Sequence, residues 1–129
     1  MSLTKPIGAV NPIPDQTSNS GKYLTTNGTS ASCGTVTTQP TVSVTSSTSF
    51  TASVNTHYVL TGTATTVTLP PSPAAGDMVW ITVANSLTTN VVARNGNQIM
   101  GLDQDMTIDK SNVTVQLRWT DSTYDWRLV

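Results

Sequence analysis

The sequence predicts an all-β protein in which an extended N-terminal arm, residues 1–40, precedes a small antiparallel β-sandwich, the module, at residues 41–129. Serine and threonine together make up 39 of the 129 residues, and glutamate does not occur. Threonine and valine suit strands, whereas glutamate, leucine and alanine fill helices. Apolar and polar residues alternate along the module, and turn-forming residues interrupt them at short intervals. This spacing is typical of a sandwich of jelly-roll-like form.

The arm is expected to be extended and to lack a core of its own. Its prolines remove backbone donors and favour extended neighbours. Residues 22–26 predict a short strand, and Asn27-Gly28 predicts a tight hairpin turn after it. Apolar side chains are too sparse here for an independent core, so the arm needs a partner surface. The residues expected to make that attachment are Pro6, Pro12, Pro14, Tyr23 and Leu24.

The module shows a period of two residues, which indicates strands with one covered face. The clearest case is residues 112–119, where apolar and polar residues alternate throughout. Residues 78–84 are apolar at nearly every position, which predicts a central strand or one covered by a second surface. The apolar residues expected to face the core are Val42, Val44, Phe50, Ala52, Val54, Tyr58, Leu60, Val67, Leu69, Val113, Val115, Leu117 and Trp119.

Formal charge is unevenly distributed along the chain. No charged residue lies between Lys22 and Asp77, and ten of the thirteen charges lie from Asp77 onward. A disordered linker usually carries charge or proline, so a long neutral stretch favours pairing with strands of the same or another chain. A small module with uncharged edges also gains stability when copies cover one another. The sequence therefore predicts a homo-oligomer.

Composition argues against several classes of protein. Six Lys and Arg residues spread along the chain form no basic patch for nucleic acid. No apolar run approaches the roughly 20 residues that cross a bilayer, so no membrane insertion is expected. The first residues lack the apolar stretch of a secretion signal, and we expect the chain to stay in the compartment where it is made. A single cysteine, Cys33, excludes an internal disulfide.

No catalytic residue and no cofactor is assigned from the sequence. The single histidine, His57, is interpreted as a turn or interface residue, because no Gly-x-Ser-x-Gly or Ser-x-x-Lys pattern accompanies it. Cys33 is interpreted as a small packed residue. No glycine-rich loop that would cradle a phosphate occurs.

An acidic segment and two aromatic residues are the remaining candidate sites. Asp103, Asp105 and Asp109 would lie on one side of a strand, so we interpret them as a solvent-facing set. Calcium binding by Asp103 and Asp105 stays open as an alternative, although the loop lacks the usual glycine and closing acid; no metal site is assigned. Trp119 and Trp126 fall on inward positions. Trp80 and Tyr124 are therefore the expected glycan contacts.

Residues 21–36 carry a resemblance to a known group of proteins. Gly21-Lys-Tyr-Leu-Thr-Thr-Asn-Gly28 resembles a segment that recurs in virion fibres of tailed bacteriophages, where Ser and an aromatic residue follow; Cys33 stands at the aromatic position. The lead at residues 3–6 and 12–16 is similar to the proline-rich lead of such segments. The second half resembles small β-modules of phage fibre and decoration proteins at residues 67–71, 75–77, 91–96, 98–99 and 124–127.

The resemblance implies a non-enzymatic virion structural protein, a homotrimer made in the bacterial cytoplasm and carried on the virion surface. Residues 1–40 would bind another virion protein of the capsid or tail, and the module would project outward. The short chain favours a capsid-decorating or head-fibre protein. Two alternatives stay open: a module that binds a host receptor or surface glycan, and a depolymerase, which would need paired carboxylates in a groove.

Overall fold

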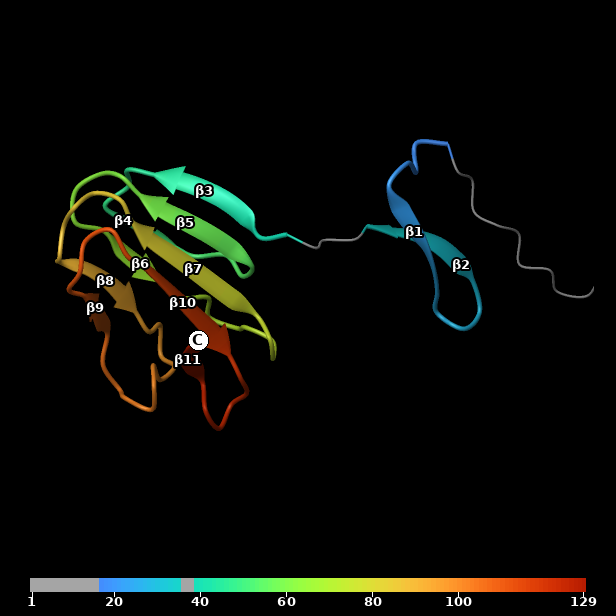
Figure 1. Ribbon diagram of the computed structural model, residues 1–129. Helices are drawn as coiled ribbons and strands as arrows, with labels where there is room; N and C mark the ends of the chain where they lie inside the picture. The colour runs from blue at the N-terminus through green and yellow to red at the C-terminus, as the bar shows by residue number, and fades with distance from the viewer. Residues whose placement is uncertain (1–16, 36–38) are drawn as a thin grey trace, which may run out of the picture. The chain divides into compact units, whose positions relative to one another are not determined.

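The computed structural model describes residues 17–35 and 39–129, and the chain divides into two compact units, Met1–Thr38 and Gln39–Val129 (Figure 1). The described residues form eleven strands and no helix, which confirms the all-β prediction. No helix that could cross a membrane occurs in this part of the chain. Three of the expected attachment residues, Pro6, Pro12 and Pro14, lie outside the described residues.

The described residues of the first unit form an antiparallel hairpin of β1 (Lys22–Thr26) and β2 (Ala31–Thr35). The turn forms because Asn27 accepts hydrogen bonds at Oδ1 from the backbone N–H groups of Thr29 and Ser30, at 2.9 and 2.8 Å. The predicted strand and turn are therefore confirmed. Every residue described in this unit, 17–35, is exposed or half-buried, so the hairpin encloses no core.

The second unit, which contains the module, has two sheets packed face to face (Figure 1). The five-stranded sheet consists, in spatial order, of β11 (Trp126–Leu128), β10 (Thr114–Trp119), β7 (Met78–Val83), β5 (Thr56–Leu60) and β3 (Thr41–Thr45). The four-stranded sheet consists of β4 (Ser49–Thr51), β6 (Thr66–Thr68), β8 (Asn90–Ala93) and β9 (Met106–Ile108). The prediction of a central strand is confirmed, because β7 lies in the middle of the larger sheet.

The predicted antiparallel pairing is wrong for the first six strands of the module. From β3 to β8 the chain alternates between the two sheets, so that β3, β5 and β7 pair in parallel, as do β4, β6 and β8. Only β9, β10 and β11 add antiparallel partners. A jelly roll, which is antiparallel throughout, does not describe this coil. Parallel neighbours need a crossover connection, and here each crossover is a short strand of the opposite sheet. The turns along the sequence are therefore spaced as closely as they would be in a series of hairpins.

Successive turns of the coil stack closely at one corner. The backbone N–H of Thr61 donates to Thr45 O at 2.9 Å, and Thr65 Oγ1 donates to Ser47 O at 3.0 Å. A Cβ on Gly62 would lie only 2.5 Å from the carbonyl oxygen of Ser46. The corner therefore requires glycine at position 62 because of close backbone approach.

A buried asparagine, Asn90, joins the segment between β5 and β6 to the segment between β7 and β8. Asn90 is fully buried, and its Oδ1 accepts from the N–H of Thr65 at 3.0 Å and from Asn85 Nδ2 at 2.9 Å. Its Nδ2 donates to Asn85 Oδ1 at 3.2 Å and to Leu87 O at 3.3 Å. The side-chain amide thus satisfies backbone groups that have no strand partner, which offsets its burial.

The core lies between the two sheets and contains most of the residues expected there. Trp119 and Trp126 pack edge to face with ring centroids 5.6 Å apart, which confirms their inward assignment. Phe50 and Tyr58 form the second aromatic contact, at 4.7 Å. The fully buried apolar side chains are Leu60, Val67, Leu69, Val79, Ile81, Val83, Val92, Leu117 and Trp126.

Val42, Val44 and Val54 were expected to face the core, and this expectation is wrong. Val42 and Val44 are 62% and 67% exposed, and Val54 lies exposed beyond the end of β4. The register of β3 with β5 explains why Val42 and Val44 are exposed. It places them on the outer face of the sheet and turns Ser43 inward beside Tyr58. Alternation shows which residues share a face but not which face is covered.

Candidate functional site

Tyr23 and Leu24 lie on β1 of the coreless hairpin and are 48% and 59% exposed. The Tyr23 ring lies over Gly34, where an added Cβ would be 2.9 Å from its Cζ atom. Cys33 is half-buried opposite Leu24 in the register. The hairpin therefore presents two large apolar side chains to its surroundings, as a docking segment would.

Trp80 lies half-buried on the outer face of the five-stranded sheet. The register places Val42, His57, Trp80 and Gln116 in one row across four strands. Arg118 is the only formally charged residue in β3, β5, β7 and β10. This face combines an aromatic ring, exposed valines and hydrogen-bonding side chains without a carboxylate.

His57 lies within β5 rather than in a turn, and it belongs to a chain of hydroxyls on this face. Its Nε2 is 2.7 Å from Thr82 Oγ1, which is 2.6 Å from Thr114 Oγ1. This contact was not predictable from the sequence, because His57 and Thr82 are 25 positions apart. A catalytic base also needs a group that orients it, and among the described residues the imidazole has only this hydroxyl partner. The three side chains tie neighbouring strands together.

Tyr124 occupies the loop between β10 and β11 and is 57% exposed. The Arg127 guanidinium lies over the Tyr124 ring, 5.6 Å from its centroid. The backbone N–H of Tyr124 donates to Asp121 Oδ1 at 3.0 Å. β10 separates β7, which carries Trp80, from β11. The ring contacts found among the described residues do not join Trp80 to Tyr124, so the two expected glycan contacts form no single stacking platform.

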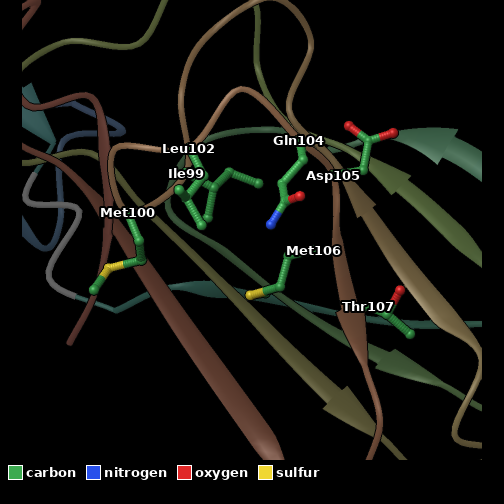
Figure 2. Close-up of a pocket in the computed structure, with 7 residues that line it drawn as sticks. All are labelled: Ile99, Met100, Leu102, Gln104, Asp105, Met106 and Thr107. Carbon is green, nitrogen blue, oxygen red and sulfur yellow. The ribbon is translucent and has the colours of Figure 1, made fainter.

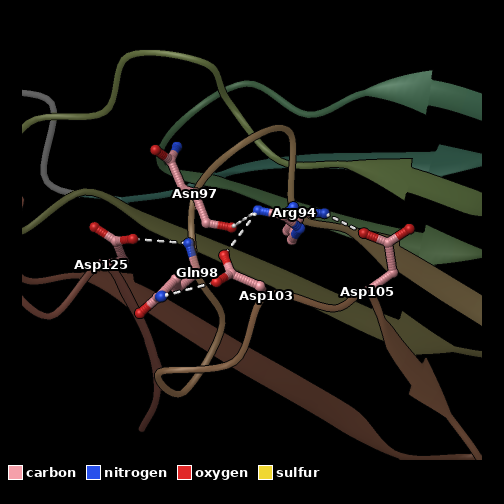
Figure 3. Close-up of polar contacts among 6 residues, drawn as sticks. All are labelled: Arg94, Asn97, Gln98, Asp103, Asp105 and Asp125. Carbon is pink, nitrogen blue, oxygen red and sulfur yellow. Dashed lines mark hydrogen bonds and ion pairs between the residues drawn. The ribbon is translucent and has the colours of Figure 1, made fainter.

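Asp103 and Asp105 hold the loop between β8 and β9 (Figure 3). Asp103 accepts from Arg94 Nη1 and from Gln98 Nε2, both at 3.3 Å, while Asp105 Oδ1 accepts the backbone N–H of Arg94 at 2.9 Å. Asp125 Oδ2 accepts the N–H of Gln98 at 2.7 Å. These carboxylates therefore have structural partners. In the described ranges, no group of three or more His, Cys, Asp or Glu side chains could hold a metal ion.

We expect the thermal midpoint of the full chain to be the same in calcium and in EDTA. The reason is that Arg94 and Gln98 already donate to both oxygens of Asp103, and the backbone N–H of Arg94 donates to Asp105 Oδ1. Asp103→Asn is the matched variant. It should lower the free energy of unfolding by about 0–1 kcal/mol, because the Arg94–Asp103 ion pair is partly exposed. A calcium-dependent rise in the midpoint that Asp103→Asn removes would contradict this assignment.

A pocket of about 420 Å³ lies between β9 and the turn at residues 99–102 (Figure 2). Ile99, Leu102, Gln104 and Met106 surround the hollow, whereas the side chains of Asp105 and Thr107 point away from it. The lining residues are Ile99, Met100, Leu102, Gln104, Asp105, Met106 and Thr107. This pocket was not predicted from the sequence. Its one signal was the apolar Ile-Met-Gly-Leu stretch, in which methionine stands where a tight turn favours asparagine.

Comparisons with known proteins assign no family. No family model matches the chain, and no curated protein matches its sequence.

Proposed function

We propose that this chain is a non-enzymatic structural protein of a bacteriophage virion, a short fibre or decoration protein. Residues 1–40 hold it on the particle by binding a capsid or tail protein, and the module projects from the surface. The resemblance to phage fibres supports three copies per assembly. Repetition multiplies individually weak contacts without any new contact type.

The observation that carries this proposal is the contrast between the two units. The hairpin buries none of its described residues, yet it exposes Tyr23 and Leu24. A two-stranded hairpin is at best marginally stable alone. Full burial of one such apolar side chain contributes about 1.5–3 kcal/mol, so docking on a partner would stabilise hairpin and contact together. The module, by contrast, encloses its own core.

Deleting Met1–Thr38 should leave a folded module that no longer loads onto particles, because the docking segment is gone. Within the full chain, Leu24→Ser should weaken loading at least about 10-fold, equivalent to about 1.4 kcal/mol. Val42→Ser, which changes an equally exposed side chain of the module, should load like the parent. Sedimentation of particles after mixing measures the bound fraction. Normal loading of the truncated chain would refute the attachment role of the N-terminal residues.

Glycan binding is the second candidate function, favoured by Trp80 on a face without carboxylates and by the exposed Tyr124. In this case the full chain binds polysaccharide from a permissive host in a saturable way. Because the two rings form no single platform, the variant at the ring that binds, Trp80→Ala or Tyr124→Ala, should weaken binding about 10-fold, whereas the other variant and Val44→Ala should not. Lack of saturable binding by the parent chain would dispose of this candidate.

A further inference from the structure

The strand β9 leaves backbone hydrogen-bonding groups open at the edge of its sheet. The N–H of Val91 donates to Thr65 O at 2.9 Å and so points toward β6. Successive residues of a strand direct these groups to opposite sides, so Asn90 and Val92 direct theirs toward β9. Their partners there are Ile108 and Met106. The N–H and C=O of Thr107 consequently face away from β8, along an edge to which no described strand pairs.

The pocket begins directly inside this open edge. The side chains of Gln104 and Met106 line it from the inner side of the strand, while Asp105 and Thr107 direct theirs to the outer side (Figure 2). A strand added beside β9 would direct every second side chain inward, about 6.6 Å apart. Main-chain bonds at the edge and a pocket for alternate side chains are the two elements of strand-addition sites.

The turn that forms the opposite wall is strained at Met100. Ile99 and Leu102 exchange backbone hydrogen bonds of 3.2 and 3.0 Å, and the two residues between them have φ angles of 55° at Met100 and 80° at Gly101. Turns of this kind favour Asn-Gly. Among the described residues, all other non-glycine residues with positive φ are Asn, Asp or Ser. The Met100 Sδ accepts the backbone N–H of Leu128 at 3.2 Å, so this residue joins the turn to β11 in spite of its strained backbone.

The outer side of the same edge is acidic. Asp105 and Asp109 flank β9, both are exposed, and their positions alternate in step with Thr107. Among the described cations nearby, Arg94 pairs with Asp103, Arg127 lies beside Gly101 on the opposite wall of the pocket, and Lys110 follows Asp109 in the sequence. Outward side chains of an added strand would therefore meet carboxylates, and a basic residue fits there.

We propose that the β9 edge and this pocket bind an extended peptide segment of a partner protein. Apolar side chains at alternate positions enter the pocket, and a basic side chain between them lies beside Asp105 and Asp109. The main chain of that basic residue pairs with Thr107. This site goes beyond the proposed virion role and does not depend on it, because attachment of the chain to a particle uses residues 1–40.

The probe is a labelled peptide, Gly-Thr-Leu-Lys-Leu-Thr-Gly, titrated with the full chain and followed by fluorescence anisotropy. We expect saturable binding with a dissociation constant below about 1 mM, which is in the weak range for a short peptide. N-methylation of the lysine amide, which removes the donor to Thr107, should weaken binding at least about 10-fold. A peptide with the two leucines adjacent should bind as weakly as the N-methylated peptide, because only one leucine can then point into the pocket. No binding below 1 mM, or equal binding of the N-methylated peptide, would overturn the proposal.

Variants of the chain test each part of the site. Thr107→Pro removes the outward N–H at a position where an edge strand tolerates proline, and Thr107→Val keeps it. The first should weaken binding at least about 10-fold and the second less than about 2-fold. Leu102→Ser should also weaken it. If Thr107→Pro fails to fold, the N-methylated peptide still decides the main-chain contact. Dimerisation of the parent chain that Thr107→Pro abolishes would assign the edge to a second copy and overturn the partner-peptide proposal.

Discussion

Replacing Asn90 with leucine should lower the free energy of unfolding of the module by about 3 kcal/mol. Leucine has the same number and branching of side-chain heavy atoms and is larger than asparagine, so the loss does not come from a cavity. The N–H of Thr65, which is a buried residue, would lose its partner, and the half-buried hydrogen bonds of Asn90 to Asn85 and to the carbonyl of Leu87 would be lost as well. Each buried group left without a partner costs about 1–3 kcal/mol.

Urea denaturation of the full chain, followed by tryptophan fluorescence, measures this change. Thr89→Leu is the matched control, since it makes a similar change at the exposed neighbouring position and should cost less than about 0.5 kcal/mol. Equal stability of Asn90→Leu and the parent would show that the asparagine does not hold the connecting segments together.

Gly62→Ala should destabilise the module by about 1–3 kcal/mol or more, the range for overpacking. The added methyl would lie 2.5 Å from the Ser46 carbonyl oxygen, and backbone cannot move aside as a flexible side chain does. For a domain of this size, each kcal/mol lowers the midpoint by about 4–8 °C. Differential scanning calorimetry measures the midpoint.

Gly34→Ala is the control for this change, because position 34 belongs to the hairpin and its close neighbour is the flexible Tyr23 ring. It should leave the melting of the module unchanged. An unaltered midpoint for Gly62→Ala would contradict the stacking of turns in the coil.

The existence of the strands was predictable because covered and open faces alternate in strands such as β10, where Leu117 and Trp119 are buried and Arg118 is exposed. The hairpin was predictable because Asn27 forms its turn through local hydrogen bonds. The parallel coil was not, because a crossover through the opposite sheet has the same period and turn spacing as a hairpin. The outward orientation of Val42 depends on the register with β5, which no local pattern contains.

The candidate sites also differ in whether they could be predicted from the sequence. Asp103, Asp105 and Asp109 are exposed as expected, but the prediction that they share a strand is wrong, because β9 comprises only Met106–Ile108 and Asp103 lies in the loop before it. The pocket escaped prediction because Ile99 and Leu102 come from a turn and Met106 from a strand. Only the tertiary fold brings these residues together. The pairing of His57 with Thr82 was missed for the same reason.

Hydrogen–deuterium exchange of the full chain, free and bound to particles, tests the central claim most directly. Amides of β5, β7 and β10 should be protected in both states, because the module encloses its own core. Amides of Lys22–Thr26 and Ala31–Thr35 should exchange within seconds in the free chain and become protected on the particle. Protection of this hairpin in the free, monomeric chain, unchanged on binding, would contradict the account.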